Sequence, residues 1–555
     1  MRTRRSSLRL LALGAVALMT VVVPLNFSSA APVTSANENG RTIVLALPGP
    51  FTGCTYLNGA GETSTGAILD LVRPSAFVTT PEGDLQGQGG AITSAELTSL
   101  QPETVRYTLA RGLHWSNGAL FTGSDLVAWW QRARRLSSVV SDGYRAISSL
   151  SVSNAGRTVL AVFHENYADW NLLFRDVEER GVAGGCALSK LLRDPSLGPY
   201  RVVSATTSRV VLAMNPSWPL DPNRFGHVVV TTTRLPPSGA NVEFAGYSST
   251  VTQPFVQALS SYPALSSRIG ISNEIAEVTY APGGAATRRL VVRKALSWAL
   301  NRQAMIDRLW GSVTFSPSVA DSALYSQGQS AYPGFGGSGP AGQATTTTTT
   351  PSAATNGLGD CFICAVQLLR SSGYQHRLGH WYNTRGTPLA IRLGVGPSDL
   401  DAAIARLALA SWNHLGIIVR PVHESSDVAT SVAVATSTVD VGIFSRPTST
   451  AVSTTARSWS GASFRDSYPS GVRMSKVVSL FTQGVTTFNP VTANSTWLQM
   501  DQILMRAYWV RPLFTTPTVE SWSSTLSSVQ GSFLVAGYVD QLPSWSVSPL
   551  QPSSG

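Results

Sequence analysis

The residues whose types and spacing could support chemistry lie in the second half of the chain. Cys361, Cys364, His376 and His380 follow the pattern C-x2-C-x11-H-x3-H. Two thiolates and two imidazoles at such a spacing can close a tetrahedral zinc site. An even number of cysteines in an exported protein instead favours disulfides. We therefore expect a local Cys361–Cys364 disulfide, with zinc as the minor alternative.

Other signatures of catalysis or cofactor binding lack the context they need. No G-x-S-x-G, H-E-x-x-H or S-x-x-K motif occurs in a suitable setting. Gly337, Gly339 and Gly342 form a G-x-G-x-x-G pattern, but no strand precedes it and no helix directly follows it. The sequence therefore predicts no cofactor and no enzyme, and a secreted hydrolase is a distant alternative.

Length and composition predict a globular protein of several domains. The 555 residues exceed what one hydrophobic core normally serves, so we expect two or three domains. The chain is 43% hydrophobic and 13% charged, which excludes long disorder over most of its length. The net charge is +10, and without Arg2, Arg4, Arg5 and Arg9 of the N-terminal leader 10 minus 4 leaves +6, which is mild for such a length. No basic run with interleaved aromatic residues occurs. Nucleic acid is therefore not an expected partner.

Residues 1–31 have the pattern of an export signal. An arginine-rich start precedes the apolar segment Leu10–Val23, and small residues at Ser28–Ala31 form a cleavage region. Arg4 and Arg5 also resemble a twin-arginine signal. No cysteine ends the apolar segment, so a lipid anchor would have no attachment point. We expect a protein in the periplasm or envelope exterior, soluble or tethered by an uncleaved signal.

The stretch Tyr107–Trp130 predicts a strand, a tight turn and a capped helix. Apolar and polar residues alternate over Val105–Leu109, as in a half-buried strand. Ser116–Gly118 supplies turn residues. Thr122 and Asp125 then form a capping box before apolar residues at helical spacing.

This stretch resembles a signature of the family 5 bacterial extracellular solute-binding proteins, the oligopeptide, dipeptide and nickel receptors of ABC importers. The family pattern is Y-T-F-x-L-R-x-G-x-x-W-S-D-G-x-x-x-T-A-x-D. The positions that match are Leu109, Gly112, Trp115, Ser116, Gly118, Thr122 and Asp125, with Tyr107 at the Phe position. The positions that depart from it are Val105, Arg106 and Ala110, while Asn117 replaces the family Asp and keeps the turn.

Later segments resemble the same family in the same order. They are Leu197–Val202, Arg293–Leu309, Cys361–Tyr374, Gly416–Val419, Asp440–Phe444 and Arg511–Phe514. Arg293–Leu309 is predicted to be one amphipathic helix, and Asp399–Leu415 another.

The resemblance implies a mixed α/β, two-lobed fold of the large three-domain, oligopeptide-binding type. Domain I would comprise residues 41–70, 191–280 and 508–545, and domain II residues 71–190. Domain III would span 281–507, with a flexible low-complexity insertion at 334–359.

The resemblance also implies candidate site residues. Those expected along the ligand cleft are Tyr56, Tyr280, Phe444, Arg446 and Phe514. It brings Cys54 and Cys186 near one another, which implies a second disulfide besides Cys361–Cys364. In peptide-binding relatives, an Asp soon after the strand matching Asp440–Phe444 pairs with the ligand's α-amino group. Here Ser445, Arg446 and Pro447 follow instead, and Arg446 would favour an anion.

The implied function is capture of a peptide or other small solute between two lobes and its delivery to an ABC permease, by a monomer that catalyses nothing. The alternative is a non-transport envelope scaffold or regulator on the same fold, of the type involved in lipid-mannoside assembly. A plugged cleft would favour the scaffold, and a polar pocket would favour transport.

Overall fold

The computed structural model describes residues 41–547 except 59–62, 137–140, 220–224, 238–241, 250, 314, 316, 330, 334–359 and 461–471. All described residues belong to one compact unit that begins at Gly40. The predicted export signal at 1–31 and the predicted insertion at 334–359 lie outside the described residues. In the part of the chain that the structure describes, no helix is both long and apolar enough to cross a membrane.

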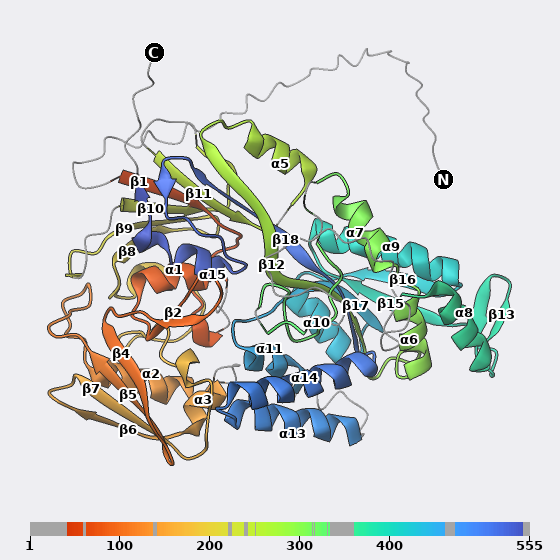
Figure 1. Cartoon of the computed structure of the whole chain (residues 1–555), viewed down its shortest axis with the longest axis horizontal. Coiled ribbons are helices and arrows are strands. Elements are labelled where there is room, and N and C mark those ends of the chain that lie inside the picture. Colours follow the sequence, from red (N-terminus) through yellow and green to blue (C-terminus); the bar gives the residue numbers. More distant parts are fainter. Residues whose placement is uncertain are drawn as a thin grey trace, which may run out of the picture. The chain divides into compact units, whose positions relative to one another are not determined.

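A ten-stranded mixed sheet draws strands from N-terminal, middle and C-terminal parts of the chain (Figure 1). Its strands are β1 (Arg41–Ala46), β8 (Tyr200–Ala205), β9 (Arg209–Met214), β10 (Phe225–Thr231), β11 (Val242–Ser248), β12 (Leu265–Tyr280), β15 (Ala390–Val395), β16 (Ile418–His423), β17 (Val441–Pro447) and β18 (Val510–Ser523). The order across the sheet is β16-β15-β17-β12-β18-β11-β1-β10-β9-β8. The central pair, β12 and β18, therefore joins the β15–β17 half to the half that contains β1 and β8–β11.

The pairing of β12 with β18 is interrupted near its middle. Ile271 pairs with Pro517, but the next paired residue, Ile275, is opposite Thr515. Four steps along β12 thus match two steps along β18, which is a β-bulge. The residues inside this bulge are Ser272, Asn273 and Glu274.

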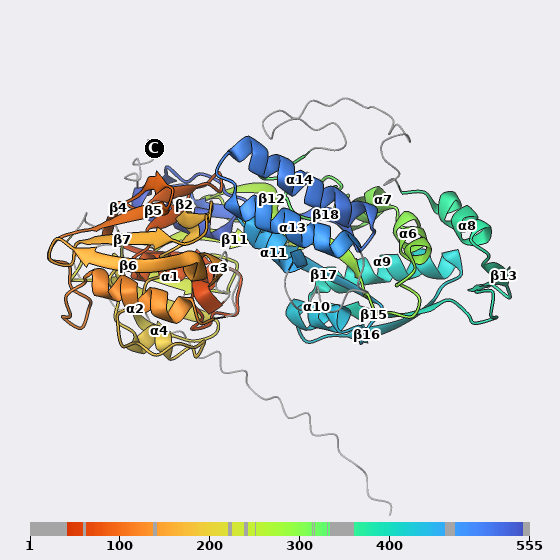
Figure 2. The same ribbon diagram turned by 90° about the horizontal axis from the view of Figure 1, so that it is seen from below.

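A separate antiparallel sheet forms from the early part of the chain. Its order is β4 (Ile92–Leu100), β5 (Glu103–Leu109), β7 (Thr158–Phe163) and β6 (Ile147–Ser153). Helix α2 (Gly123–Ala133) packs against β6 and β7 (Figure 2). The predicted capping box is confirmed, because the Thr122 hydroxyl caps the helix and Asp125 accepts the Thr122 N–H at 2.8 Å. Tyr107, Trp115 and Trp129 are fully buried in this core.

Helices cover the sheets, and short strand pairs and 3-10 turns complete the fold. The other helices are α1 (Ser64–Val72), α3 (Ser141–Ala146), α4 (Lys190–Arg193), α5 (Gln253–Ser260), α6 (Leu290–Trp298), α7 (Arg302–Trp310), α8 (Phe362–Ser371), α9 (Asp399–Leu415), α10 (Asp427–Ala435), α11 (Val452–Ser460), α13 (Val472–Thr486), α14 (Pro490–Arg506) and α15 (Val535–Val539). The short strand pairs are β2 (Phe77–Thr79) with β3 (Leu85–Gly87), β13 (Gln375–Arg377) with β14 (His380–Tyr382), and β19 (Leu526–Ser527) with β20 (Ser546–Val547). The 3-10 turns are η1 (Tyr56–Asn58), η2 (Trp170–Leu172) and η3 (Leu542–Ser544).

One predicted helix is two helices in the structure. Arg293–Leu309 was expected to be continuous, but α6 ends at Trp298 and α7 begins at Arg302. Asn301 causes the break, because its side-chain oxygen accepts the Ala304 N–H at 2.9 Å and so caps a new helix. In contrast, the predicted helix Asp399–Leu415 is confirmed over its whole length as α9.

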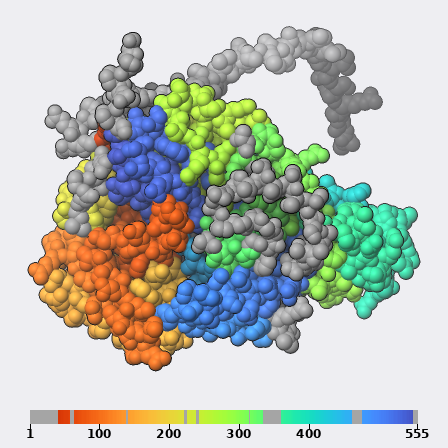
Figure 3. Space-filling view, in the orientation of Figure 1, coloured from red at the N-terminus to blue at the C-terminus, as the bar shows by residue number. Residues whose placement is uncertain are grey.

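Helices α13 and α14 lie beside the four-stranded-sheet region. Figure 3 shows their blue surface directly next to the orange surface of the early chain. At this junction the Ala168 N–H donates to the Val485 carbonyl of α13 at 2.7 Å. Arg457 of the neighbouring helix α11 forms an ion pair with Asp142 of α3. The early sheet is therefore tied to the C-terminal helices as well as to the large sheet.

We predict that Thr122→Ala lowers the free energy of unfolding by about 1 kcal/mol, because it removes the hydroxyl that caps α2. Thr122→Ser keeps that acceptor and should unfold close to the wild type. Urea unfolding followed by tryptophan fluorescence measures both. Equal losses in the two variants would contradict the role of the cap.

Candidate functional site

A cavity of about 1160 Å³ opens beside the bulge of β12. Its walls come from the loop between β1 and α1, the end of β11, the bulge, the start of α10, and the chain from the end of β17 into α11. The lining residues are Pro48, Gly49, Pro50, Tyr56, Leu57, Thr63–Thr65, Leu136, Cys186, Tyr247, Ser249, Ser272–Glu274, Ser426–Val428, Arg446–Ser449, Thr454, Thr455, Ser458 and Val535. Both halves of the large sheet thus contribute to one cavity.

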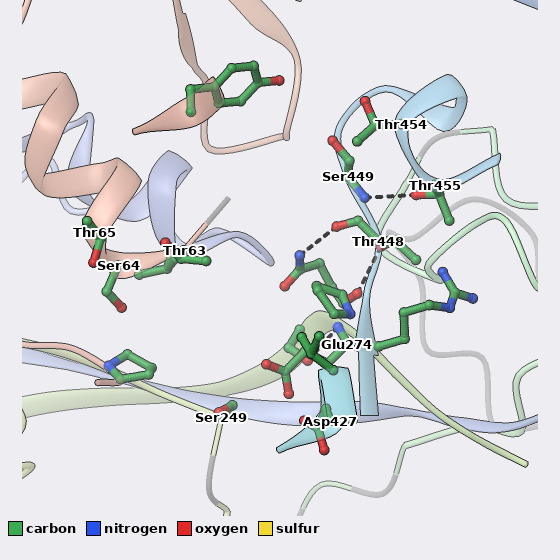
Figure 4. A pocket seen from close by; sticks show the side chains of 18 of the residues that line it. Thr63, Ser64, Thr65, Ser249, Glu274, Asp427, Thr448, Ser449, Thr454 and Thr455 are labelled. Carbon is green, nitrogen blue, oxygen red and sulfur yellow. Dashed lines mark hydrogen bonds between the residues drawn. The ribbon is translucent and has the colours of Figure 1, made fainter. Parts of the chain in front are cut away.

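Many of the lining residues carry hydroxyl groups. The hydroxyl-bearing residues other than tyrosine are Thr63, Ser64, Thr65, Ser249, Ser272, Ser426, Thr448, Ser449, Thr454, Thr455 and Ser458. Figure 4 shows Thr63, Ser64 and Thr65 on one side of the open space, with Thr448 and Glu274 on the other. Hydroxyls both donate and accept hydrogen bonds, so such walls suit a polar ligand.

The bulge is held in place by side-chain hydrogen bonds. The Ser272 hydroxyl donates to the Thr516 carbonyl at 2.9 Å, and the Glu274 N–H donates to the Ser272 hydroxyl at 3.1 Å. The Asn273 amide nitrogen donates to the Thr448 carbonyl at 2.7 Å. These bonds fix the orientation of Asn273 and the backbone of Glu274 at the cavity wall.

Three carboxyl groups meet at this wall. Glu274 comes from the bulge, Asp427 from the first residue of α10, and Asp401 from the first turn of α9 behind them. A Cβ built on Gly396 would lie 2.5 Å from Asp427 Oδ1 and 2.6 Å from Asp401 Oδ2, so both aspartates crowd the same glycine. The backbone there has no room for a larger residue.

Burial and mutual repulsion raise the pKa values of these groups. Burial, followed by the charges of Asp427 and Asp401, raises the pKa of Glu274 to about 7. Burial and the neighbouring Asp401 raise the pKa of Asp427 to about 6. Burial also raises the pKa of Asp401. The wall therefore gains negative charge over the pH range around neutrality.

Arg446 lines the cavity, but its charge is compensated within the protein. Its guanidinium contacts Glu277 at 3.0 Å, donates to the Ala323 carbonyl at 2.6 Å and lies over the Trp459 ring at 5.4 Å. An arginine in this position holds two parts of the fold together. Its Nη1 has no hydrogen-bond partner among the described residues, so an anion bound there would share the guanidinium with Glu277.

The structure separates the aromatic residues predicted along the cleft into two groups. Tyr56 lines the cavity. Tyr280, Phe444 and Phe514 do not line it and are buried in the interior. Tyr280 bonds Ser297 of α6 at 2.8 Å, and the Phe514 ring packs on Trp310 of α7 at 5.0 Å. Alternate residues of a strand face opposite sides, and these aromatics face the covering helices or the core.

The four cysteines form two disulfides, Cys54–Cys186 and Cys361–Cys364. The first lies at the cavity, because Cys186 lines it and the Gly53 N–H donates to the Cys186 carbonyl at 3.1 Å. The second consumes the thiolates that the alternative zinc site needs. His376 instead packs against Trp381 at 4.9 Å, and nowhere in the described ranges do three or more His, Cys, Asp or Glu residues form a group able to hold a metal.

Sequence reasoning missed Glu274 and Asp427. It looked for an acid directly after the strand Asp440–Phe444, whereas the structure brings acids to this wall from β12 and α10. One signal was present: the polar run Ser272–Glu274 interrupts the apolar alternation of Ile269, Ile271 and Ile275. Such a break within a buried strand indicates a bulge or a site.

Comparison of the chain with known proteins identifies its family. The family model for bacterial extracellular solute-binding proteins, family 5 middle region, matches residues 89–463. The chain belongs to this family. Its predicted mixed α/β, two-lobed solute-binding fold is also confirmed, because this family 5 chain overlays solved solute-binding proteins over nearly its whole length.

The names of two solved structures similar to this chain give different ligands. The periplasmic EDTA-binding protein EppA has a TM-score of 0.76 at 18% identity, over 93% of this chain and 98% of that one. The oligopeptide-binding protein AppA from Bacillus subtilis, in complex with a nonapeptide, has a TM-score of 0.69 at 11% identity, over 93% of this chain and 100% of that one. At such identities the likeness shows the fold alone.

Two curated mycobacterial proteins are similar to part of this family 5 chain. The oligopeptide-binding protein OppA of Mycobacterium tuberculosis is 28% identical over 199 residues, which is 33% of each chain. The probable monoacyl phosphatidylinositol tetramannoside-binding protein LpqW of Mycobacterium tuberculosis is 27% identical over 184 residues, 31% of this chain and 29% of LpqW. The chain thus matches about a third of the length of these relatives.

We predict that the ligand-free protein loses stability as the pH rises from about 4 to about 7, with Glu274 contributing. The pKa of Glu274 is raised in the folded state, so the folded protein binds the proton more tightly than the unfolded chain does, and ionisation weakens folding. Glu274→Gln removes this contribution. Thermal unfolding should show that the melting temperature of Glu274→Gln increases relative to that of the wild type as the pH rises to about 7.

Glu82→Gln is the matched control, because Glu82 is exposed and does not line the cavity. Its melting temperature should follow that of the wild type at each pH. A constant offset between Glu274→Gln and the wild type, independent of pH, would contradict the prediction.

Proposed function

We propose that this protein is the extracytoplasmic solute-binding component of an ABC importer. It captures a peptide or other small polar solute in the cavity beside the β12 bulge and delivers it to a membrane permease. The observation that carries this proposal is the cavity of about 1160 Å³, whose hydroxyl-rich walls come from both halves of the large sheet. Family membership supports it, because the matching family model describes extracellular solute-binding proteins.

The central strands offer a hinge between two lobes. The proposed domain I comprises residues 41–70, 191–280 and 508–545, domain II residues 71–190, and domain III residues 281–507. β12 pairs with β17 on one side and β18 with β11 on the other, so the β12–β18 pair belongs to both halves. Bending at the bulge changes the distance between walls such as Thr63–Thr65 and Thr448. Closure would bury the solute and present a new surface to the permease.

The lining supports binding without covalent chemistry. Among the described residues that line the cavity there is no histidine and no lysine, and Cys186 is held in a disulfide. The described lining therefore offers no nucleophile activated by histidine or lysine and no free thiol. The similar proteins named above are binding proteins as well.

A second candidate function is that of an envelope scaffold or regulator that does not transport. The similarity to LpqW, whose printed name describes binding of a phosphatidylinositol mannoside, favours it. The two functions differ in whether the lobes close. Small-angle scattering that shows compaction with a bound solute supports the importer, and a fixed radius with every solute that binds supports the scaffold.

We predict that the purified protein carries a solute in the cavity and that Ser249→Trp abolishes its binding. Ser249 lines the cavity, and an indole there would occupy space that the ligand needs. Native mass spectrometry should show an adduct on the wild type that dissociates on denaturation, and no adduct on Ser249→Trp.

Ser260→Trp is the control, because Ser260 is exposed on α5 and does not line the cavity. It should keep the adduct. The same adduct on Ser249→Trp would place the ligand elsewhere and contradict the proposal.

A further inference from the structure

The wall formed by the bulge and α10 presents hydrogen-bond acceptors that lack donors. Asn273 is 8% exposed and lines the cavity. Its amide nitrogen is committed to the Thr448 carbonyl, so its Oδ1 is free to accept, and no residue in the described ranges donates to it. The Glu274 carboxylate likewise receives no hydrogen bond from the residues that the structure describes.

Asp427 adds a third acceptor. Its Oδ1 is buried beside the Asp401 carboxyl group, with which Asp427 can share a proton, and no other described residue donates to that oxygen. A buried acceptor without a donor costs roughly 1–3 kcal/mol, and more when it is charged. Asp427 Oδ1 is the buried one of these acceptors, whereas Asn273 and the half-buried Glu274 keep their acceptors accessible at the cavity that they line, where a ligand can supply donors.

The charge of this wall is also uncompensated. In the described part of the chain, no Lys, Arg or His forms an ion pair with Glu274, Asp427 or Asp401. Arg446, the charged neighbour from β17, is held by Glu277. Buried carboxylates are ordinarily paired or coordinate metals, and these described residues form no group able to hold a metal ion.

We propose that the cavity selects solutes that carry a protonated amine, which Glu274, Asp427 and the Asn273 side-chain oxygen bind together. This inference rests on the proposed solute-binding function and names its ligand class. An ammonium group brings three N–H donors and one positive charge, which match these acceptors and reduce the excess negative charge. The hydroxyls of Thr63–Thr65 and Thr448–Ser449 then serve the rest of the solute.

The titration of the wall supports the same ligand class. Without ligand, the raised pKa values keep protons on part of the Glu274, Asp427 and Asp401 group near neutrality. An ammonium group favours the ionised carboxylates, so its binding releases protons to solvent. Affinity should therefore rise with pH through about 6 to 7.

A protonated amine can belong to a peptide or to another solute, such as an amino sugar. Two probe pairs distinguish these sources: trialanine with N-acetyl-trialanine, and glucosamine with N-acetylglucosamine. Each pair preserves most of the molecule and removes the charge. Preference for trialanine alone identifies a peptide amine, and preference for glucosamine alone identifies a non-peptide amine.

Isothermal titration of the full chain with each probe tests the proposal. At least one amine should bind the wild type tenfold or more tightly than its acetylated partner, since a charged hydrogen bond contributes about 1.5–3 kcal/mol. The double variant Glu274→Gln, Asp427→Asn should lose that preference. Titration in two buffers of different ionisation enthalpy should detect proton release in the wild type only.

The matched control is Glu82→Gln, Asp84→Asn, which removes the same two residue types from exposed positions outside the cavity. It should behave as the wild type does. Equal binding of amines and acetylated analogues, including no binding of either, overturns the amine proposal. If acetylated probes bind and Ser249→Trp abolishes that binding, the proposed solute-binding function stands. If Ser249→Trp does not affect the binding of any probe, both the amine proposal and the proposed function are contradicted.

Discussion

The pairing of two long strands, β12 and β18, is the constraint on which the site depends. Each strand is shared by both halves of the ten-stranded sheet, so the halves meet along one ladder. The bulge at Ser272–Glu274 breaks that ladder, and Ser272 and Asn273 replace the lost backbone pairing with bonds to Thr516 and Thr448. One local irregularity thereby turns three residues of a central strand toward a cavity.

Some charged groups in the interior of this fold are matched by ion pairs and others are not, among the residues that the structure describes. Arg73 contacts Glu178 at 2.8 Å and Asp194 at 3.0 Å, so its buried charge is matched. Glu274 and Asp427 have no such partners in the described part of the chain. Glu103 and Asp501 are also buried carboxyl groups with an oxygen that lacks a partner among the described residues, but they do not line the cavity. The position of Glu274 and Asp427 at the cavity is therefore what points to a role in binding.

Much of the fold could be predicted from local sequence, and less of the site could. Turn and cap residues act within a few positions, so the Thr122–Asp125 capping box and the full extent of α9 were both predictable. The break at Asn301 was not, because asparagine occurs in helix interiors as well as at caps. Tyr280 and Phe514 were placed on the correct strands, but sequence does not say which face of a two-sided buried strand meets the ligand.

The location of the acceptors bears on how a ligand would close the lobes. A ligand shifts a conformational equilibrium only by its difference in affinity for the two states. Glu274 lies in the bulge of the shared strand, Asp427 belongs to the β15–β17 half, and Thr63–Thr65 lie on the opposite wall. Suppose that the amine of a solute contacts Glu274 and Asp427 while its other end contacts Thr63–Thr65. Such a solute makes all of its contacts only when the two walls approach each other. Neutralising charge next to the bulge would then stabilise the closed state at the place where the strands must bend.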